Sequence, residues 1–129
     1  MERPTKCITV KKAKEMQDNW VNSRAIAIEG ALGYEDTREF VFSISELQEY
    51  LDYVREKSRE QGINNPGIRI YLASYPSTDG DKSLSTVFLS PTKGGSFAFN
   101  TEDGEDDNNY DIDPLNDANS GMPPKDYNP

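Results

Sequence analysis

The sequence predicts a small α+β fold, in which an antiparallel sheet carries two helices packed on one face, followed by an acidic C-terminal tail. Three observations lead to this class. Apolar residues recur at helical spacing in two segments, they alternate with polar residues in a later segment, and the residues after Asn100 are rich in Asp, Asn, Gly and Pro. We therefore expect one domain over residues 1–100 and a tail over residues 101–129, either disordered or docked as an extension.

The first helix is expected from about Val10 to Asn22, with Thr9 as its N-cap. Residues 23–37 mix small and apolar residues with two glycines, and this pattern leaves short helix and strand equally open. Within the helix, four apolar side chains share one face that we expect to lie in the core: Val10, Ala13, Met16 and Trp20.

The second helix has the clearest start signal in the chain. A short strand over residues 38–42 leads into Ser43, and Glu46 follows three residues later, which is the spacing of a capping box. Gly62 suits the left-handed position just beyond a helix end. The apolar stripe expected to face the core consists of Leu47, Tyr50, Leu51 and Val54.

An antiparallel hairpin is expected over residues 68–89. The first strand, residues 68–75, alternates apolar and polar side chains, so that Ile68, Ile70 and Leu72 should face the core. A turn-rich segment leads to the second strand, residues 84–89, and residues 96–99 could add an edge strand.

Most of the net negative charge of the chain lies in the tail. The chain has 14 basic and 23 acidic residues, and residues 101–129 hold nine of the acidic ones but a single lysine. Such a tail opposes nucleic acid and anionic membranes, so we expect neither as a partner. No long apolar run or apolar leader is visible, and Cys7 is the only thiol, which together favour a cytoplasmic protein.

The catalytic repertoire is narrow because the sequence contains no histidine. This absence removes the Ser-His, Cys-His and His-metal constellations, and Cys7 has no partner cysteine. We expect no cofactor and a non-catalytic protein. The acidic stretch after residue 102 fails the EF-hand template, because with Gly104 at position six Phe99 and Tyr110 would fill positions one and twelve. No metal site is therefore predicted, and the weak candidates for divalent binding are Asp103, Asp106, Asp107, Asp111 and Asp113.

Two further sets of residues are candidate binding sites. One could line a groove for a planar or anionic ligand, although such residues more often form a solvent-facing cation and aromatic stack on a half-exposed sheet: Arg38, Arg69, Tyr71 and Tyr75. The other holds the few apolar side chains of the tail, spaced as in a motif that either binds a partner or folds back on its own domain: Ile112, Leu115, Met122, Pro123 and Pro124.

Several segments resemble a family of short uncharacterised bacterial proteins over residues 38–124. The resemblance implies a bacterial cytoplasmic protein and no known activity. The family's ending often carries cysteines beside the prolines, and their absence here argues against a metal site at that end. The segments that carry the resemblance are FSISEL (42–47), GIRIYLASYP (67–76), TVFLSPT (86–92), DIDPLN (111–116) and GMPP (121–124).

Three functions follow from these features. The first is a non-catalytic protein-interaction module whose sheet and acidic tail bind another protein. The second is an immunity or inhibitor protein that masks the basic site of a toxin or nuclease. The third is a small-molecule-binding or enzymatic domain built on the Arg and Tyr set. The partner and the oligomeric state are not predicted.

Overall fold

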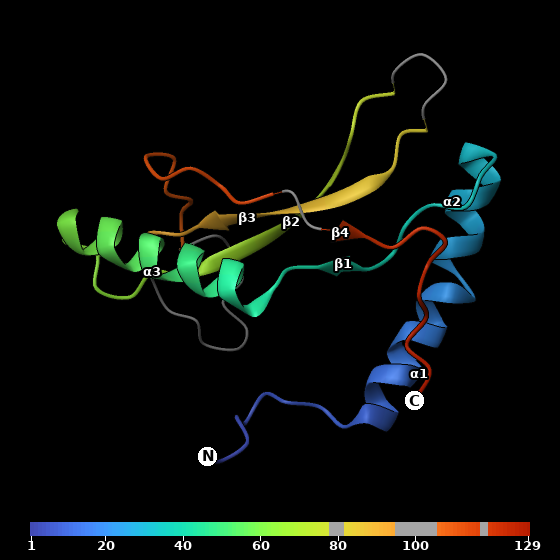
Figure 1. Ribbon diagram of the computed structural model, residues 1–129, viewed down its shortest axis with the longest axis horizontal. Coiled ribbons are helices and arrows are strands. Elements are labelled where there is room, and N and C mark those ends of the chain that lie inside the picture. Colours follow the sequence, from blue (N-terminus) through green and yellow to red (C-terminus); the bar gives the residue numbers. More distant parts are fainter. Residues whose placement is uncertain (78–81, 95–105, 117–118) are drawn as a thin grey trace. The chain divides into compact units, whose positions relative to one another are not determined.

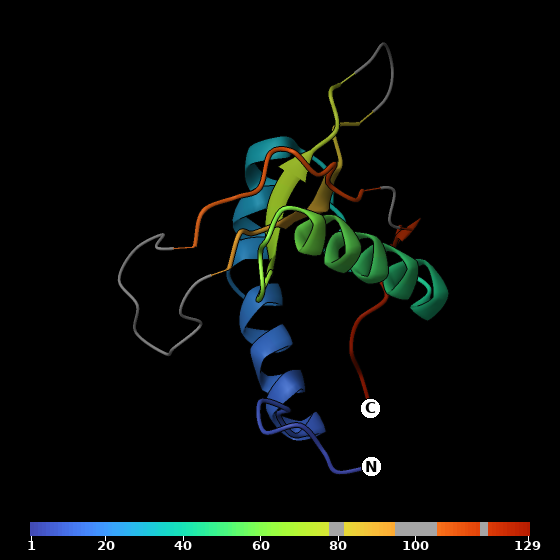
Figure 2. The same cartoon turned by 90° about the vertical axis from the view of Figure 1, so that its left-hand side faces the viewer.

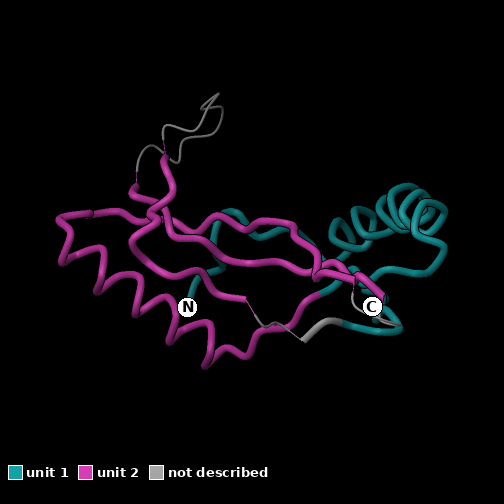
Figure 3. The backbone as a smooth tube through the Cα atoms, turned by 90° about the horizontal axis from the view of Figure 1, so that it is seen from above, with its two compact units in different colours: residues 1–39, 121–129 teal, residues 40–120 magenta. Residues whose placement is uncertain are grey.

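The computed structural model describes residues 1–77, 82–94, 106–116 and 119–129 (Figure 1). Helices and a small antiparallel sheet are both present, so the predicted α+β class is confirmed. The chain divides into two compact units: unit 1 comprises Met1–Glu39 with Gly121–Pro129, and unit 2 comprises Phe40–Ser120 (Figure 3).

Unit 1 contains the first two helices. Helix α1, Val10–Val21, begins as predicted, because the side chain of Thr9 accepts a hydrogen bond of 3.0 Å from the backbone nitrogen of Lys12. Helix α2, Arg24–Leu32, fills the segment that the sequence left open. It ends at Gly33, whose φ of 81° is the left-handed conformation that glycine adopts without strain.

The predicted core face of α1 is wrong. Val10 and Met16 are exposed, Ala13 and Trp20 are half-buried, and neither α1 nor α2 contains a buried residue. Helical spacing shows which side chains share a face, but unit 1 contributes no sheet among its described residues to cover that face.

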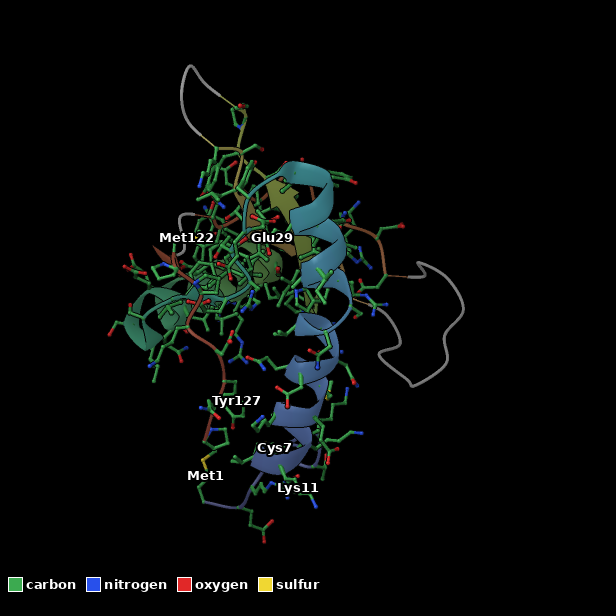
Figure 4. The ribbon with its side chains drawn as sticks, turned by 90° about the vertical axis from the view of Figure 1, so that its right-hand side faces the viewer. Met1, Cys7, Lys11, Glu29, Met122 and Tyr127 are labelled. Atoms are coloured by element: carbon green, nitrogen blue, oxygen red, sulfur yellow. The ribbon has the colours of Figure 1, made fainter. Side chains whose placement is uncertain are left out.

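The C-terminal segment of unit 1, residues 121–129, is held by hydrogen bonds to its N-terminal part. The Thr37 hydroxyl donates to the Gly121 carbonyl at 3.0 Å. The backbone nitrogen of Tyr127 donates to Oε1 of Gln17 at 2.7 Å, and Figure 4 shows Tyr127 beside α1. The end of the predicted tail is therefore joined to the start of the chain.

Unit 2 is built on the predicted hairpin. Strands β2, Ile68–Ser74, and β3, Ser85–Pro91, pair antiparallel with Ile70 opposite Leu89 and Leu72 opposite Val87. The hairpin prediction is confirmed, whereas the tip of the connection and the possible edge strand at residues 96–99 lie outside the described residues.

A second, shorter pairing joins the start of unit 2 to its end. Strand β1, Phe40–Val41, is two residues long where five were predicted, and it pairs antiparallel with strand β4, Asn119–Ser120. Its partner comes from the predicted tail, which local sequence signals could not indicate.

Helix α3, Ile44–Glu60, has the predicted ends. The side chain of Ser43 accepts a hydrogen bond of 3.0 Å from the backbone nitrogen of Glu46, and Gly62 follows the helix with φ of 76°. The helix lies beside the β2–β3 sheet (Figures 1 and 2). The helix packed on this sheet is thus α3, while α1 and α2 belong to unit 1.

The core of unit 2 draws on three separate parts of the chain. Tyr50 and Val54 of α3 pack with Leu89 of β3 and with Ile112 of the predicted tail, and all four are buried. The predicted helix stripe is confirmed at its two buried members, and Leu47 packs against the cluster. Part of the predicted tail therefore belongs to the hydrophobic core.

Candidate protein-interaction surface

The outer edge of β3 is covered by residues 106–116, which we call the docked segment. Leu89 and Leu115 exchange two backbone hydrogen bonds, of 2.8 and 2.9 Å, and the backbone nitrogen of Asn109 donates to the Pro91 carbonyl at 2.8 Å. These bonds occupy the backbone groups that β3 directs away from β2. The docked segment therefore closes one edge of the sheet.

Buried polar contacts hold the docked segment in one position. Asn109 is only 1% exposed, and its amide donates to Oε1 of Gln61 at 2.6 Å. The Tyr50 hydroxyl donates to the Asp113 carbonyl at 2.9 Å. Burial, followed by the nearby Tyr53 and Asp113, raises the pKa of Tyr50 to about 12, so this hydroxyl remains a donor at neutral pH.

Three of the four predicted ligand-binding residues contact the docked segment. Arg69 donates to the Asn108 side chain at 2.6 Å and to the Asp106 carbonyl at 2.7 Å. The Asn108 amide donates to the Tyr71 hydroxyl at 2.7 Å, and the Tyr75 hydroxyl donates to a side chain of the same segment at 3.1 Å. Their polar atoms thus bind the protein's own chain.

The fourth predicted residue, Arg38, belongs to unit 1. Its guanidinium forms ion pairs with Asp126 at 2.7 Å and with Glu35 at 3.4 Å. The geometry brings Arg69, Tyr71 and Tyr75 together along the hairpin and assigns Arg38 to the other unit. Ligand binding by the four residues stays a prediction.

The apolar residues of the predicted tail are divided between the two units. Ile112 and Leu115 lie in unit 2, where Ile112 is buried and Leu115 packs against the same core. Met122, Pro123 and Pro124 lie in unit 1, where Met122 is exposed. Ile112 and Leu115 therefore fold back on the protein's own domain, which is one of the two alternatives that the sequence left open.

The weak metal candidates are dispersed. Asp103 lies outside the described residues, and Asp106 accepts a hydrogen bond of 2.8 Å from the backbone nitrogen of Gly94. Asp107, Asp111 and Asp113 are exposed. Across the described ranges, no three side chains of the metal-ligating types come together.

The outer edge of β2 differs from that of β3. Bonds of 2.9 and 3.0 Å, from Thr92 to the Gly67 carbonyl and from Tyr75 to the Leu84 carbonyl, set which residues face β3. By alternation, the backbone groups of residues 69, 71 and 73 point toward β3, and those of Ile68, Ile70 and Leu72 point away. No backbone hydrogen bond from another described residue reaches these outward groups.

The side chains along this open edge lie on the predicted core face, but the predicted burial is wrong for two of them. Ile70 and Leu72 were expected in the core but are 66% and 76% exposed, whereas their partners across the sheet, Leu89 and Val87, are 5% and 7% exposed. The buried cluster of α3 packs against Leu89 and against Ile68 at the start of β2, which leaves the rest of β2 uncovered. Two large exposed apolar side chains therefore lie beside backbone groups that no other described residue pairs.

A groove between α3 and the start of β2 adjoins the open edge. Its volume is about 500 Å³, and its charged lining residues are two arginines, Arg55 and Arg59. Neither guanidinium forms an ion pair within the part of the chain that the structure describes. The apolar side chains of the lining are Leu51, Val54, Ile63, Pro66 and Ile68.

The sequence did not reveal the contacts and surfaces that define the candidate binding edge. The contact between Asn109 and Gln61 joins residues 48 positions apart, and no local sequence pattern predicts it. The groove arginines resemble ordinary charges of a solvent-facing helix surface. The uncovered state of β2 depends on where α3 lies, which alternation along one strand does not encode.

Comparisons with known proteins identify no relative of this chain. No protein-family model matches the chain, and searches of curated proteins and of solved structures give no significant match. The resemblance to short bacterial proteins stays a prediction. In the described part of the chain, no helix has the length and apolar character needed to cross a bilayer.

Proposed function

We propose that this chain is a non-catalytic protein-interaction module that binds its partner through the outer edge of β2. One observation carries the proposal: the outward backbone groups of Ile70 and Leu72 are unpaired among the described residues, and both side chains are exposed. Extended peptides bind such edges by adding a strand to the sheet. The partner's backbone supplies the hydrogen bonds, and its alternate side chains cover the apolar surface.

The composition of the edge supports this function. Solvent-exposed edge strands are usually protected by Lys, Pro or a bulge, because unpaired edges promote aggregation. Residues 70–73 read Ile-Tyr-Leu-Ala and contain none of these protective residues, and the pairing with β3 is regular. An unprotected apolar edge is therefore better explained as a binding surface than as solvent-facing structure.

The docked segment takes a different role from the one expected of the tail. Its backbone and apolar side chains are engaged within unit 2, where they cover the β3 edge. A partner strand is thereby directed to β2, the edge that remains open. Among the described residues, the β2–β3 sheet accordingly offers its β2 edge for binding.

One observation keeps the immunity or inhibitor function as a second candidate. Asp107, Asp111 and Asp113 are exposed on the docked segment, where they present negative charge from a fixed backbone. Binding to a basic partner through these carboxylates would weaken steeply as ionic strength rises. Binding through the β2 edge would change little, and would persist when all three are replaced by Asn.

Site-specific photocrosslinking tests the proposed function. A photoreactive amino acid replaces Leu72, and the matched control places it at the exposed Glu56 of α3. We expect a discrete protein adduct from position 72 alone, and the purified adduct partner should bind the wild-type chain and lose affinity for Leu72→Pro. Adducts from both positions alike, or a partner indifferent to Leu72→Pro, would contradict the proposal.

A further inference from the structure

We infer that the β2 edge recognises an extended, antiparallel peptide segment of the pattern apolar-x-apolar-x-acidic, with the acidic side chain opposite Ile68. This inference rests on the proposed function and specifies its partner. Three features of unit 2 lead to it: the direction of the outward backbone groups of β2, the exposed apolar pair, and the groove arginines, which have no ion-pair partner within the described ranges.

The backbone fixes the spacing of the recognised side chains. Ile68, Ile70 and Leu72 each direct one N–H and one carbonyl away from β3, as alternation in the ladder requires. An antiparallel strand pairs three alternate residues with these three. Directly opposite side chains lie on the same face of a sheet, so the three peptide side chains share the face of Ile70 and Leu72.

The apolar positions follow from the exposure of Ile70 and Leu72. Both project from the sheet face that α3 covers further along, since their partners Leu89 and Val87 lie on that face and Leu89 packs against α3. Apolar peptide side chains opposite Ile70 and Leu72 would remove exposed hydrocarbon on both molecules from water. Polar side chains at these two positions would leave it in place.

The acidic position follows from the groove. Ile68 lines the groove together with Arg55 and Arg59, so a side chain opposite Ile68 is directed to the mouth of this cavity. A carboxylate there meets two guanidinium groups that lack an ion-pair partner among the described residues, and no acidic residue lines the groove. Arginine binds carboxylates with short, charge-assisted and often bidentate hydrogen bonds.

A second copy of the chain fits this edge less well. Two β2 strands could pair antiparallel across a twofold axis with Ile70 opposite Leu72, which would satisfy the backbone and the apolar pair. Ser74 would then lie opposite Ile68, and β2 contains no acidic residue. Both arginines would remain without a counter-ion, so charge complementarity favours an acidic peptide.

Fluorescence anisotropy with a defined peptide tests the inference. The probe is fluorescein-labelled Gly-Ser-Ile-Thr-Val-Thr-Glu-Ser-Gly, and two controls replace Glu by Gln or reverse the order of the five central residues. We expect the Glu peptide to bind the 129-residue chain about tenfold more tightly than the Gln peptide, the gain of one buried charge-assisted contact. The reversed peptide should bind more weakly than the original.

Matched variants assign the charge effect to the groove. In the double variant Arg55→Gln/Arg59→Gln the preference for Glu over Gln should fall below about twofold. Lys57→Gln removes a positive charge from the exposed surface of the same helix and should retain the tenfold preference. Leu72→Pro and Leu72→Lys should each abolish binding of both peptides, with folding verified by an unchanged amide spectrum elsewhere.

The outcomes separate the inference from the proposed function. Equal binding of the Glu and Gln peptides, both abolished by Leu72→Pro, would overturn the acidic specificity and leave the β2 edge as the binding surface. No binding of either peptide, with a dimer in light scattering that Leu72→Pro dissociates, would assign the edge to a second copy and overturn the inference. No binding and no dimer would overturn it as well, and a silent photocrosslinker at position 72 would then remove the proposed function.

Discussion

The two edges of the β2–β3 sheet belong to one hairpin and differ in what lies against them. On the β3 side the docked segment supplies backbone hydrogen bonds to Leu89 and a buried side chain, Ile112. On the β2 side the backbone groups of Ile70 and Leu72 have no partner among the described residues, and both side chains are exposed. The comparison teaches that hydrophobicity alone does not decide which edge of a sheet is covered.

The docked segment overcomes its polar composition through a few specific contacts. Asp-, Asn- and Pro-rich chains rarely bury enough apolar surface to offset their ordering entropy. Here Ile112 joins the core, and Asn109 and the Asp113 carbonyl form hydrogen bonds with Gln61 just beyond α3 and with the buried Tyr50. These contacts add to the backbone hydrogen bonds with β3 and to the packing of Leu115 against the same core.

Truncating the apolar anchor of the covered edge should have the largest effect on stability. Ile112 is 2% exposed and packs with Tyr50 and Leu89, so Ile112→Ala should lower the free energy of unfolding of unit 2 by about 3 kcal/mol. Ile70→Ala, on the open edge, should change it by less than about 0.5 kcal/mol. Urea denaturation measures both changes. Equal losses of unfolding free energy in the two variants would contradict the proposed difference between the edges.

Proline substitution at adjacent positions of β2 distinguishes inward from outward backbone groups. Ala73→Pro removes a donor directed at β3 and should lower stability by about 2 kcal/mol. Leu72→Pro removes a donor that has no partner among the described residues and should cost less than about 1 kcal/mol. Thermal or urea unfolding of the pair gives the comparison, and a greater loss for Leu72→Pro would contradict the assigned direction of the ladder.

Removing the buried amide of the docked segment should have a moderate effect. Asn109→Ala leaves Oε1 of Gln61 without its 2.6 Å partner and should lower stability by about 1.5 kcal/mol. It should also speed amide exchange at Leu115 by loosening the segment. Asn64→Ala, at an exposed asparagine of the same unit, serves as the control and should leave both measurements unchanged.

Of the four stability effects predicted here, removal of the Tyr50 hydroxyl should have the smallest at neutral pH. Tyr50→Phe removes its hydrogen bonds to the Leu89 and Asp113 carbonyls and should lower stability by about 1 kcal/mol. The folded pKa of about 12 exceeds the ordinary value of 10, so this group's contribution is complete below pH 10 and is lost as the pH rises through 12. The stability difference between wild type and Tyr50→Phe should therefore shrink over that window, and a constant difference would contradict the raised pKa.

The sequence predicted the elements whose signals are local. Ser43 and Glu46 mark the start of α3, Gly62 marks its end, and the alternation around Ile70 marks β2, because caps and periodicity act within a few residues. Each of these features appears in the structure at or near the expected position. The α+β class follows from them.

The remaining features depend on long-range contacts that no local signal encodes. Alternation grouped Ile70 with Leu72 correctly, but the covered part of their sheet face is set by the position of α3. Asn109 was part of a tail for which the sequence left disorder and docking open, because its partner Gln61 is distant in sequence. The candidate binding surface arises from these two effects, so composition and periodicity could not reveal it.

Amide hydrogen exchange of the 129-residue chain tests the contrast between the two edges most directly. Leu89, whose N–H binds the Leu115 carbonyl, should be protected, and so should Tyr71 and Ala73, whose N–H groups face β3. The amides of Ile70 and Leu72 should exchange rapidly at a protein concentration where the chain is monomeric. Protection of Ile70 and Leu72 equal to that of Ala73 would show that the β2 edge is already covered, and would contradict the account.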